Sequence, residues 1–279
     1  MKLINPSVDL WLEYNHIDHV ARCARVCYAS KSSSEESNRK LVDSLENKGH
    51  LSMFRHESRY YIVEKKNYRT EYNAIYNKLR YYLYCPYINF AAVNGELYIV
   101  TNGQFLRDKN NADLIYLLND FEVSFMEFEH SEVGYDMLRL TFCIITQIST
   151  SRELNRVSPN NIAEQSTRYV NFGKKGGITI CLPHWWYSAK WYKKLLFKAY
   201  WKSCELMYNF ALKIGFKPED ARGVLPLDTA TKVVYTYSIP EWKHIADLRW
   251  RDKTGKAHPN AKRVIGDVVD IADENGYEI

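Results

Sequence analysis

The sequence predicts an α+β fold in which a central, mostly antiparallel sheet packs against helices within one domain, residues 1–279. Short β-branched and aromatic runs are separated by longer segments of helical period. No Gly-x-Gly-x-x-Gly or phosphate-loop sequence follows any of these runs, so a nucleotide site would have to be built from side chains. No internal repeat, low-complexity tract or long linker divides the chain. This order of elements favours α+β.

Four segments in the first half have the spacing of helices; they are residues 15–30, 36–49, 68–84 and 112–130. Ser33 and Ser34, followed by glutamates, indicate where the second one begins, and Gly49 indicates where it ends. Strands are expected at 58–64 and 96–101, the latter after a turn at Val93-Asn94-Gly95.

The second half begins with a buried strand that runs into a polar segment. The expected elements are a strand at 137–148, a turn at 173–178, an amphipathic helix at 188–214, a strand at 229–237, and helices at 240–251 and 258–273. Gly215 ends the amphipathic helix, and Pro218 opens a short one with Glu219 and Asp220 in its first turn.

Composition narrows the class of protein. Hydrophobic residues make up 46% and charged residues 25% of the 279, the balance of a globular protein with a full core. The formal charge of +5 is mild and dispersed, which suits anionic small molecules and argues against nucleic acid. No apolar stretch approaches the roughly 20 residues of a membrane span, and the first residues lack the apolar region of a signal peptide. We therefore expect a cytoplasmic protein without a membrane partner.

The cysteines show no pattern of a disulfide frame or of a metal site. They are Cys23, Cys27, Cys85, Cys143, Cys181 and Cys204. None belongs to a Cys-x-x-Cys pair, and no cysteine and histidine cluster has zinc spacing. Reduced, buried thiols and no metal are expected.

Residues 151–172 carry most of the functional information. They place three arginines, two carboxylates, amides and hydroxyls within about one helix and one loop. Arg168 beside Ser166 and Thr167 can hold a phosphate, because a planar fork of donors lies next to small hydroxyls. The segment therefore indicates a pocket for a small polar anion. The alternative is a solvated helix followed by a loop.

The run Glu164-Gln165-Ser166-Thr167-Arg168-Tyr169 resembles the signature of the flavin-dependent thymidylate synthases. Other blocks that resemble the family stand in family order; they are residues 24–30, 49–56, 222–227, 241–249 and 257–259. The family's Arg-His-Arg triplet falls on Arg156-Val157-Ser158, so only its first arginine is kept.

The resemblance implies a flavin-dependent thymidylate synthase-like fold and a transferase that forms dTMP from dUMP. The carbon would come from methylenetetrahydrofolate and the hydride from FAD, with NADPH as reductant. It further implies a homotetramer with sites at subunit interfaces. C5 of uracil is a poor nucleophile and is activated by stabilising negative charge on the ring.

Arg249 matches the family arginine that stabilises this charge, and is the catalytic residue that the resemblance implies. Its alternative role is a surface ion pair with Asp247 or Asp252. Arg222 would contact the uracil edge, and its alternative is a helix-end cation that satisfies carbonyls.

The remaining substrate-binding residues come from the signature segment. Ser166 and Arg168 would bind the 5′-phosphate, and Glu153 and Arg156 would line the same pocket. Glu164 and Gln165 would fix the loop and offer ribose contacts, although Glu164 has the alternative of a helix cap or a solvated carboxylate.

The flavin side is implied less completely. Its cofactor-binding residues are His50, Ser52, Arg55, His56, Ser238, His244 and Leu248. Arg55 stands where the family has a glutamate, and Ser238 where it has an asparagine. His50 has the alternative of a helix-end residue, and His56 that of a structural residue under the following strand.

Two other functions remain open. One is an enzyme of the same scaffold that adds another one-carbon group, such as hydroxymethyl, to a uridylate. The other is a nucleotide-binding homologue without catalysis. A binder of single-stranded nucleic acid is disfavoured, because the basic residues are not clustered.

Overall fold

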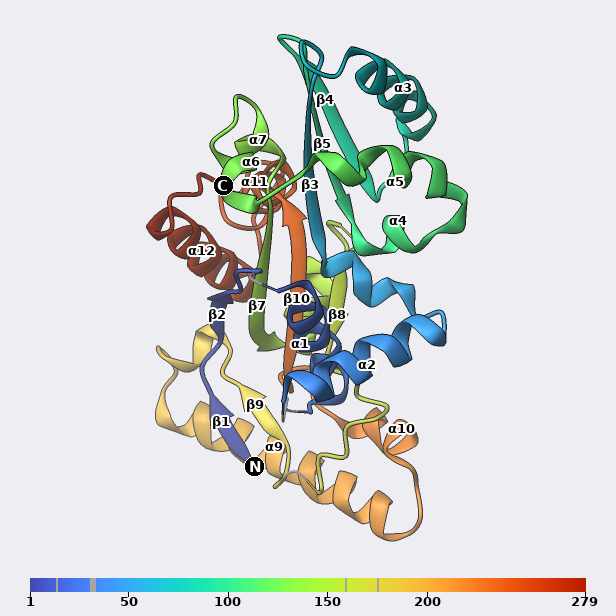
Figure 1. Ribbon diagram of the computed structural model, residues 1–279. Helices are drawn as coiled ribbons and strands as arrows, with labels where there is room; N and C mark the ends of the chain where they lie inside the picture. Colours follow the sequence, from blue (N-terminus) through green and yellow to red (C-terminus); the bar gives the residue numbers. More distant parts are fainter. Residues whose placement is uncertain (14, 31–33, 159, 175) are drawn as a thin grey trace.

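Figure 1 shows the computed structural model, which describes residues 1–13, 15–30, 34–158, 160–174 and 176–279. Its first sheet has the strand order β2-β7-β10-β8. These strands are β2 (Ser7–Leu10), β7 (Arg139–Gln147), β10 (Ala230–Ser238) and β8 (Ile162–Glu164). All three pairings are antiparallel. The long central strands β7 and β10 carry β-branched and aromatic residues that are buried on both faces.

A second antiparallel sheet has the order β4-β5-β3-β6 and lies at the top of Figure 1. Its strands are β4 (Ile88–Val93), β5 (Glu96–Asn102), β3 (Ser58–Glu64) and β6 (Glu122–Val123). The β4–β5 hairpin turns at Asn94 and Gly95, which both have positive φ, as a tight hairpin turn requires. The α+β class is confirmed, with the antiparallel strands divided between two sheets where the sequence predicted one.

Helices α11 (Ile239–Arg249) and α12 (Pro259–Glu274) cover the first sheet, and the core beneath them reaches the second sheet. Trp242 is fully buried in this core and donates its indole N–H to the carbonyl of Leu140 at 3.0 Å. Tyr60 of β3 and Tyr98 of β5 belong to the same cluster as Phe142 of β7. Each fully buried side chain of this size contributes about 1.5–3 kcal/mol.

Helices α1 (His16–Tyr28) and α2 (Glu35–Asn47) lie where the sequence predicts them. Asn15 caps α1 by accepting from the backbone of Asp18, and Ser34 caps α2 by accepting from Ser37. Ser33, the other expected signal, lies outside the described residues. Gly49, with φ of +70°, follows α2 and leads into a 3₁₀ helix at Leu51–His56.

Two expected helices are interrupted. The segment 112–130 contains α5 (Ala112–Leu118), a 3₁₀ turn, β6 and α6 (Phe125–Glu129), so one continuous helix was wrong. Ser124 and Glu127 form a capping box that begins a new helix, and β6 pairs with β3. In the segment 68–84, α3 (Arg69–Leu79) ends in a 3₁₀ turn at Arg80–Tyr82. The helical period of the two segments did not indicate these breaks.

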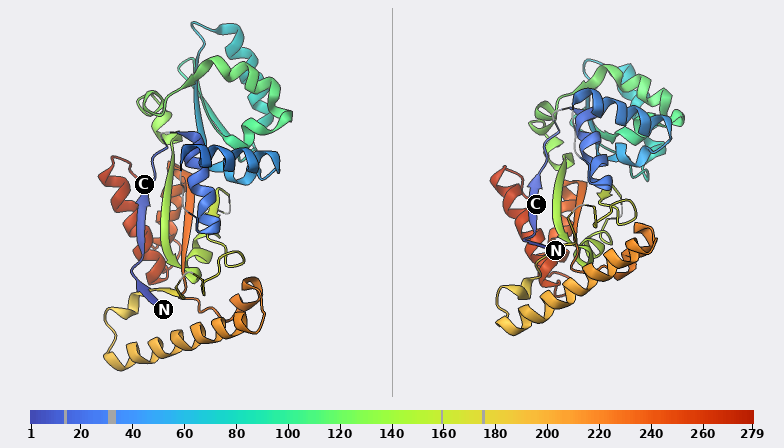
Figure 2. Two further views of the ribbon diagram at one scale, coloured as in Figure 1. Left: turned by 60° about the horizontal axis from the view of Figure 1, so that its bottom comes forward. Right: turned by 90° about the horizontal axis from the view of Figure 1, so that it is seen from below.

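The long helix α9 (Trp191–Lys213) crosses the bottom of the molecule (Figure 2). Its buried face presents Trp201 and Tyr208 to Val170, Phe172, Ile178 and Ile180. The predicted stop at Gly215 is confirmed by its φ of +100°, and α10 (Pro218–Ala221) begins at the predicted proline. The parallel pair β1 (Lys2–Ile4) and β9 (Thr179–Cys181) lies above α9.

The remaining helices are short; they are α4 (Gly103–Arg107), α7 (Gly134–Met137) and α8 (Ile148–Leu154). All six cysteines are free thiols; Cys23, Cys143 and Cys181 are buried as predicted, whereas Cys27, Cys85 and Cys204 are half-buried. Among the described residues no helix is both long and apolar enough to cross a membrane, and no group of three or more His, Cys, Asp or Glu could hold a metal ion.

Candidate functional site

The signature segment is folded by its own carboxylate. Glu164 ends β8 and accepts hydrogen bonds from Ser151 at 2.6 Å, Asn155 at 3.1 Å and Thr231 at 3.0 Å. These donors belong to α8, to the residue after it and to β10. Glu164 therefore fixes the loop, which is part of its predicted role, and it is neither a helix cap nor a solvated carboxylate.

The next residues form a turn against α1. The backbone N–H of Ser166 donates to the carbonyl of Cys27, and its Oγ accepts from the N–H groups of Arg168 at 3.1 Å and Tyr169 at 3.4 Å. The Ser166 hydroxyl still has a proton to donate. This turn holds the hydroxyl next to the backbone of Arg168, and the phosphate site stays a prediction.

Arg222 joins this turn from a distant part of the chain. It follows α10 and donates from Nη1 to the Thr167 hydroxyl at 3.3 Å. Arg168 contacts Glu219 of α10 at 3.5 Å, and both side chains of that pair are partly exposed. Because such an exposed pair is weak, both guanidinium groups keep donors for an anion. The alternative for Arg222, satisfying helix-end carbonyls, finds no such hydrogen bond in the described part of the chain.

Arg249 meets Glu153, a contact that neither motif predicts by itself. Its Nε lies 3.4 Å from Oε1 of Glu153, an ion pair without hydrogen-bond geometry. The two side chains are 21% and 28% exposed, so the pair faces solvent at one edge. The terminal amino groups of Arg249 make no hydrogen bond within the described residues.

The alternative role of Arg249 is contradicted. Asp247 pairs with Arg251 at 3.1 Å and with Lys253 at 2.6 Å. Asp252 pairs with Lys262. Both carboxylates that the alternative required are therefore committed to other cations, and Arg249 reaches across to α8.

The three residues at the position of the family triplet, residues 156–158, lie in different environments. Arg156 is exposed and makes no ion pair in the described part of the chain. Val157 packs against the main core, and Ser158 donates to Glu241 of α11 at 3.2 Å. The two positions that differ from the family are thus part of the framework.

The predicted flavin residues fall into two groups. His50, just before the 3₁₀ helix, and Ser52 on it are exposed. His244 is exposed on α11, where Leu248 is half-buried. Ser238 caps α11 in a capping box with Glu241. It also lines a polar cavity of about 300 Å³, whose described lining includes none of residues 50–56.

Arg55 and His56 have their polar groups engaged inside the chain. Arg55 donates from Nε to Gln104 at 2.6 Å and lies 4.9 Å from the centre of the Tyr87 ring. It therefore does not point freely into water. His56 is fully buried and contacts Thr236 at 2.8 Å, while its Nε2 has no partner among the described residues. These contacts favour the alternative role of His56, that of a structural residue under the following strand.

The Thr236 hydroxyl extends this contact into a buried polar chain. It lies 2.7 Å from the Thr141 hydroxyl, which lies 3.3 Å from Nε2 of His19. All four side chains are buried. Burial lowers the pKa of His56 well below its usual range and also lowers the pKa of His19. Both rings are therefore neutral at pH 7.

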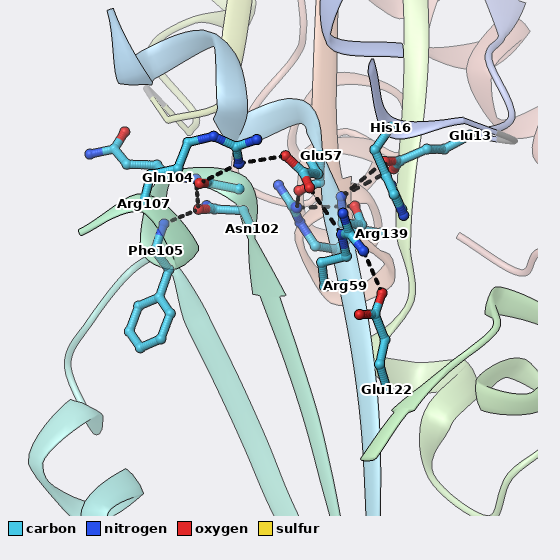
Figure 3. A network of polar contacts seen from close by, with 12 residues as sticks. Glu13, His16, Glu57, Arg59, Asn102, Gln104, Phe105, Arg107, Glu122 and Arg139 are labelled. Atoms are coloured by element: carbon cyan, nitrogen blue, oxygen red, sulfur yellow. Dashed lines mark hydrogen bonds and ion pairs between the residues drawn. The ribbon is translucent and has the colours of Figure 1, made fainter. Parts of the chain in front are cut away.

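A charged network that the sequence did not indicate lies at the base of β3 (Figure 3). The buried carboxylate of Glu57 pairs with Arg59 at 2.9 Å and with Arg107 at 2.8 Å. Arg139 donates to the carbonyls of Arg55 at 2.6 Å and Glu57 at 3.0 Å. Arg139 thus ties β7 to the segment of the predicted flavin residues. No local pattern marks it, because its partners are carbonyls of a distant segment.

One large cavity does not lie at the predicted site. It measures about 760 Å³ and lies beside the network, lined by residues such as Glu13, Arg59, Phe125 and Arg139. A second cavity, of about 530 Å³, includes one predicted residue, Gln165. The backbone N–H of Gln165 donates to the carbonyl of Lys232, which lines the same cavity.

The fold and the site define a class of protein: α+β with mainly antiparallel sheets, in which Arg168 and Arg222 meet at one turn and Arg249 pairs with Glu153. Residues 108–274 match the family model described as thymidylate synthase complementing protein. This is more than half of the chain, which therefore belongs to that family. The resemblance seen in the motifs is confirmed.

Relatives share shorter stretches. A flavin-dependent thymidylate synthase of Synechocystis sp. is 33% identical over 71 residues, 25% of this chain and 33% of that protein. A probable flavin-dependent thymidylate synthase of Paramecium bursaria Chlorella virus 1 is 41% identical over 61 residues, 22% of this chain and 28% of that protein. The matches thus span a third or less of the length of these relatives.

Among solved structures, a UMP/dUMP methylase PolB from Streptomyces cacaoi, bound with 5-Br dUMP, aligns over 98% of this chain and 93% of that one. The TM-score is 0.45 and the sequence identity is 15%.

Proposed function

We propose that this chain is a transferase that forms dTMP by reductive methylation of dUMP at C5, with methylenetetrahydrofolate as carbon donor and FAD and NADPH as reductants. The observation that carries the proposal is the ion pair between Arg249 and Glu153. It brings together two residues assigned to the same substrate from motifs far apart in the chain. A purely structural arginine at the end of α11 had nearer carboxylates available.

In this proposal Arg249 stabilises negative charge on the uracil ring. A guanidinium stays charged at any working pH and presents several fixed donors. Glu153 holds the Nε edge, so the terminal amino groups are left to face the ring carbonyls. A preorganised cation of this kind acts without reorganisation when charge develops at C5.

The phosphate of dUMP would be bound at the turn. Arg168 belongs to this turn, Arg222 donates to its Thr167, and Ser166 adds a hydroxyl. Arginine forks match the oxygen pairs of a phosphate. Arg156 would line this pocket, and Gln165 would contact the ribose. Since Glu164 already accepts three hydrogen bonds, its part is to hold the loop.

Some of the predicted flavin residues have polar groups available for a flavin, and others do not. His50, Ser52 and His244 are exposed, and their side chains make no hydrogen bond within the described residues, so they would contact the cofactor. FAD would supply the hydride when bound. Arg55, His56 and Ser238 would position this wall, because each makes a hydrogen bond inside the chain, and Leu248 would pack beside it.

We further propose one domain and a homotetramer. The main core contains side chains from both sheets, which supports one domain. The outer face of α9 supports an interface; its exposed apolar residues are Trp191, Tyr192, Leu195, Leu196, Tyr200, Leu206, Met207 and Phe210. Contiguous apolar surface of this kind marks an association site. Light scattering of the purified protein would give the mass of the assembly, and a monomer would contradict the proposal.

The deciding experiment is tritium release from [5-³H]dUMP with FAD, NADPH and methylenetetrahydrofolate, followed by mass spectrometry of the nucleotide. Release with a product one methyl group heavier is the expected result. Release with a hydroxymethylated product would replace the reaction by the same-scaffold alternative. Binding of dUMP without release would leave a non-catalytic nucleotide-binding homologue.

A further inference from the structure

The lining of the cavity of about 530 Å³ carries more positive than negative charge. It lies between α1, α2 and β10, and its charged lining residues are Asp18, Arg22, Arg25 and Lys232. Three cations thus face one carboxylate. Trp11 also lines this cavity. The substrate and flavin residues discussed above include neither Trp11 nor Arg22 nor Lys232.

Two of these charges are used in packing α1 on α2. Arg25 donates to the Asn38 side chain at 3.2 Å and to Ser37 at 2.9 Å. Asp18 accepts from the Asn38 amide at 2.8 Å. Asp18 is therefore held by α2, and it makes no ion pair with Arg22 or Lys232.

The other two cations flank one indole ring. The guanidinium carbon of Arg22 lies 3.6 Å from the centre of the Trp11 ring, and Nζ of Lys232 lies 5.2 Å from it. Trp11 is only 4% exposed, so the ring is a fixed support for both charges. Neither cation pairs with a carboxylate in the part of the chain that the structure describes. Arg22 is exposed and Lys232 half-buried, and two like charges held on one ring without a carboxylate partner attract an anion to the cavity.

We propose that this cavity binds a phosphate group of a nucleotide co-substrate, with Arg22 and Lys232 as its ligands. An arginine fork and a lysine ammonium are the usual pair for a phosphate. The backbone contact between Gln165 and Lys232 places the cavity next to the signature loop. The assignment to a nucleotide therefore rests on the proposed function. The phosphate could belong to the pyrophosphate of FAD or to the 2′-phosphate of NADPH.

The test compares Arg22→Ala and Lys232→Ala with Lys66→Ala in the full-length protein. Lys66 is exposed near the far end of β3 and makes no ion pair in the described part of the chain, so its change removes an equal charge elsewhere. Calorimetric titration with FAD, NADPH, NADH, dUMP and inorganic pyrophosphate gives the dissociation constants. Thermal unfolding checks that each variant folds, and Arg22→Lys tests partial rescue.

We expect Arg22→Ala and Lys232→Ala each to weaken pyrophosphate and one dinucleotide by about tenfold or more, and to leave dUMP unchanged. A loss for NADPH that spares NADH would select the 2′-phosphate, and a loss for FAD would select its pyrophosphate. Affinities equal to those of Lys66→Ala for pyrophosphate and both dinucleotides would overturn the phosphate site.

The same set separates this inference from the proposed function. A parent protein that releases no tritium, yet binds pyrophosphate through Arg22 and Lys232, would keep the phosphate site and remove the synthase assignment. A parent that releases tritium, with variants that bind every ligand as tightly, would do the reverse.

Discussion

The residues assigned to the substrate and those assigned to the flavin are built into this protein in different ways. On the substrate side, Arg168 and Arg222 lie exposed around one turn, and Arg249 keeps its terminal amino groups without a partner among the described residues. On the flavin side, Arg55 and His56 are engaged by Gln104 and Thr236. The two sides therefore differ in which groups they leave for a ligand: guanidinium groups on the substrate side, and His50, Ser52 and His244 on the flavin side.

This difference shows that a residue at a ligand-binding position of the family can instead stabilise the fold. Ser238 stands at a flavin position, yet its hydroxyl and backbone form the capping box that begins α11. Losing that cap would cost about 1 kcal/mol. Departures from the family are also concentrated on this side, at Arg55, Val157 and Ser158. The sharpest tests therefore contrast one residue of each kind.

The largest effect is expected at Arg249. In the Arg249→Ala protein we expect turnover to fall about 10²- to 10³-fold, as for the loss of one preorganised donor to a developing anion. Binding of dUMP should be retained, because the phosphate contacts lie elsewhere. Tritium release and calorimetric titration with dUMP measure the two quantities.

The matched control is Lys243→Ala, which removes a cation from the same helix and should leave both quantities unchanged. Glu153→Gln should give a smaller loss of turnover, because Arg249 would keep its charge and lose its orienting partner. If Arg249→Ala turned over dUMP as fast as the parent, the catalytic assignment would be wrong.

At Arg168 the effect should appear in binding. Removing a hydrogen bond to a charged phosphate costs about 1.5–3 kcal/mol, so Arg168→Ala should weaken dUMP by about 10- to 100-fold. Turnover at saturating dUMP should change less. Arg80→Ala removes the same charge from the 3₁₀ turn that follows α3 and should have no effect. In Figure 1, α3 and α10 lie at opposite ends of the molecule. An unchanged dissociation constant for Arg168→Ala would place the phosphate elsewhere.

The sequence predicted most long elements because each has a period or a local signal. The boundaries of α2 and α10 follow from the Ser34 cap and Pro218. The short strands β1, β8 and β9 have three residues each, which is too few for an alternating pattern, and their pairing depends on distant partners. The division of 112–130 depends on β6 joining β3, a tertiary contact.

For the candidate site, motifs predicted which residues matter and the fold decided what they contact. The pair Glu153–Arg249 joins α8 to α11, and neither helix carries a signal for it. The role of Glu164 was likewise set by Thr231 on a distant strand. The Glu57 network was missed because a carboxylate next to a strand is, in sequence, an ordinary surface residue.

That network offers a test of the framework alone. Glu57 is 2% exposed in its side chain and accepts from two arginines. Glu57→Gln would remove their shared buried counter-charge and leave Arg59 paired with Glu122 and Arg107 with Glu46. We expect a loss of about 1–3 kcal/mol in the free energy of unfolding. Urea unfolding measures it, and Glu36→Gln, which changes an exposed helix pair with Lys40, should cost little. Equal stability of the two variants would contradict the structural role.

The smallest expected effect is on the pH dependence of stability, to which the buried His56 contributes. The pKa of His56 is depressed by burial in the folded protein, whereas the unfolded chain takes up a proton near pH 6.5. Below about pH 6.5 the unfolded state therefore binds more protons, so stability falls as pH is lowered toward the folded pKa, by up to about 1.4 kcal/mol per pH unit.

His56→Asn keeps a polar atom for Thr236 and cannot titrate, so its stability should fall less steeply between pH 6.5 and 5.5 than that of the parent. His19 shares the depressed pKa and should leave part of the slope. His244→Asn, on an exposed ring, should keep the parent profile. Urea unfolding across this range decides the question: a slope in His56→Asn as steep as in His244→Asn would mean that His56 is protonated in the fold and open to a ligand, as a direct flavin contact would require.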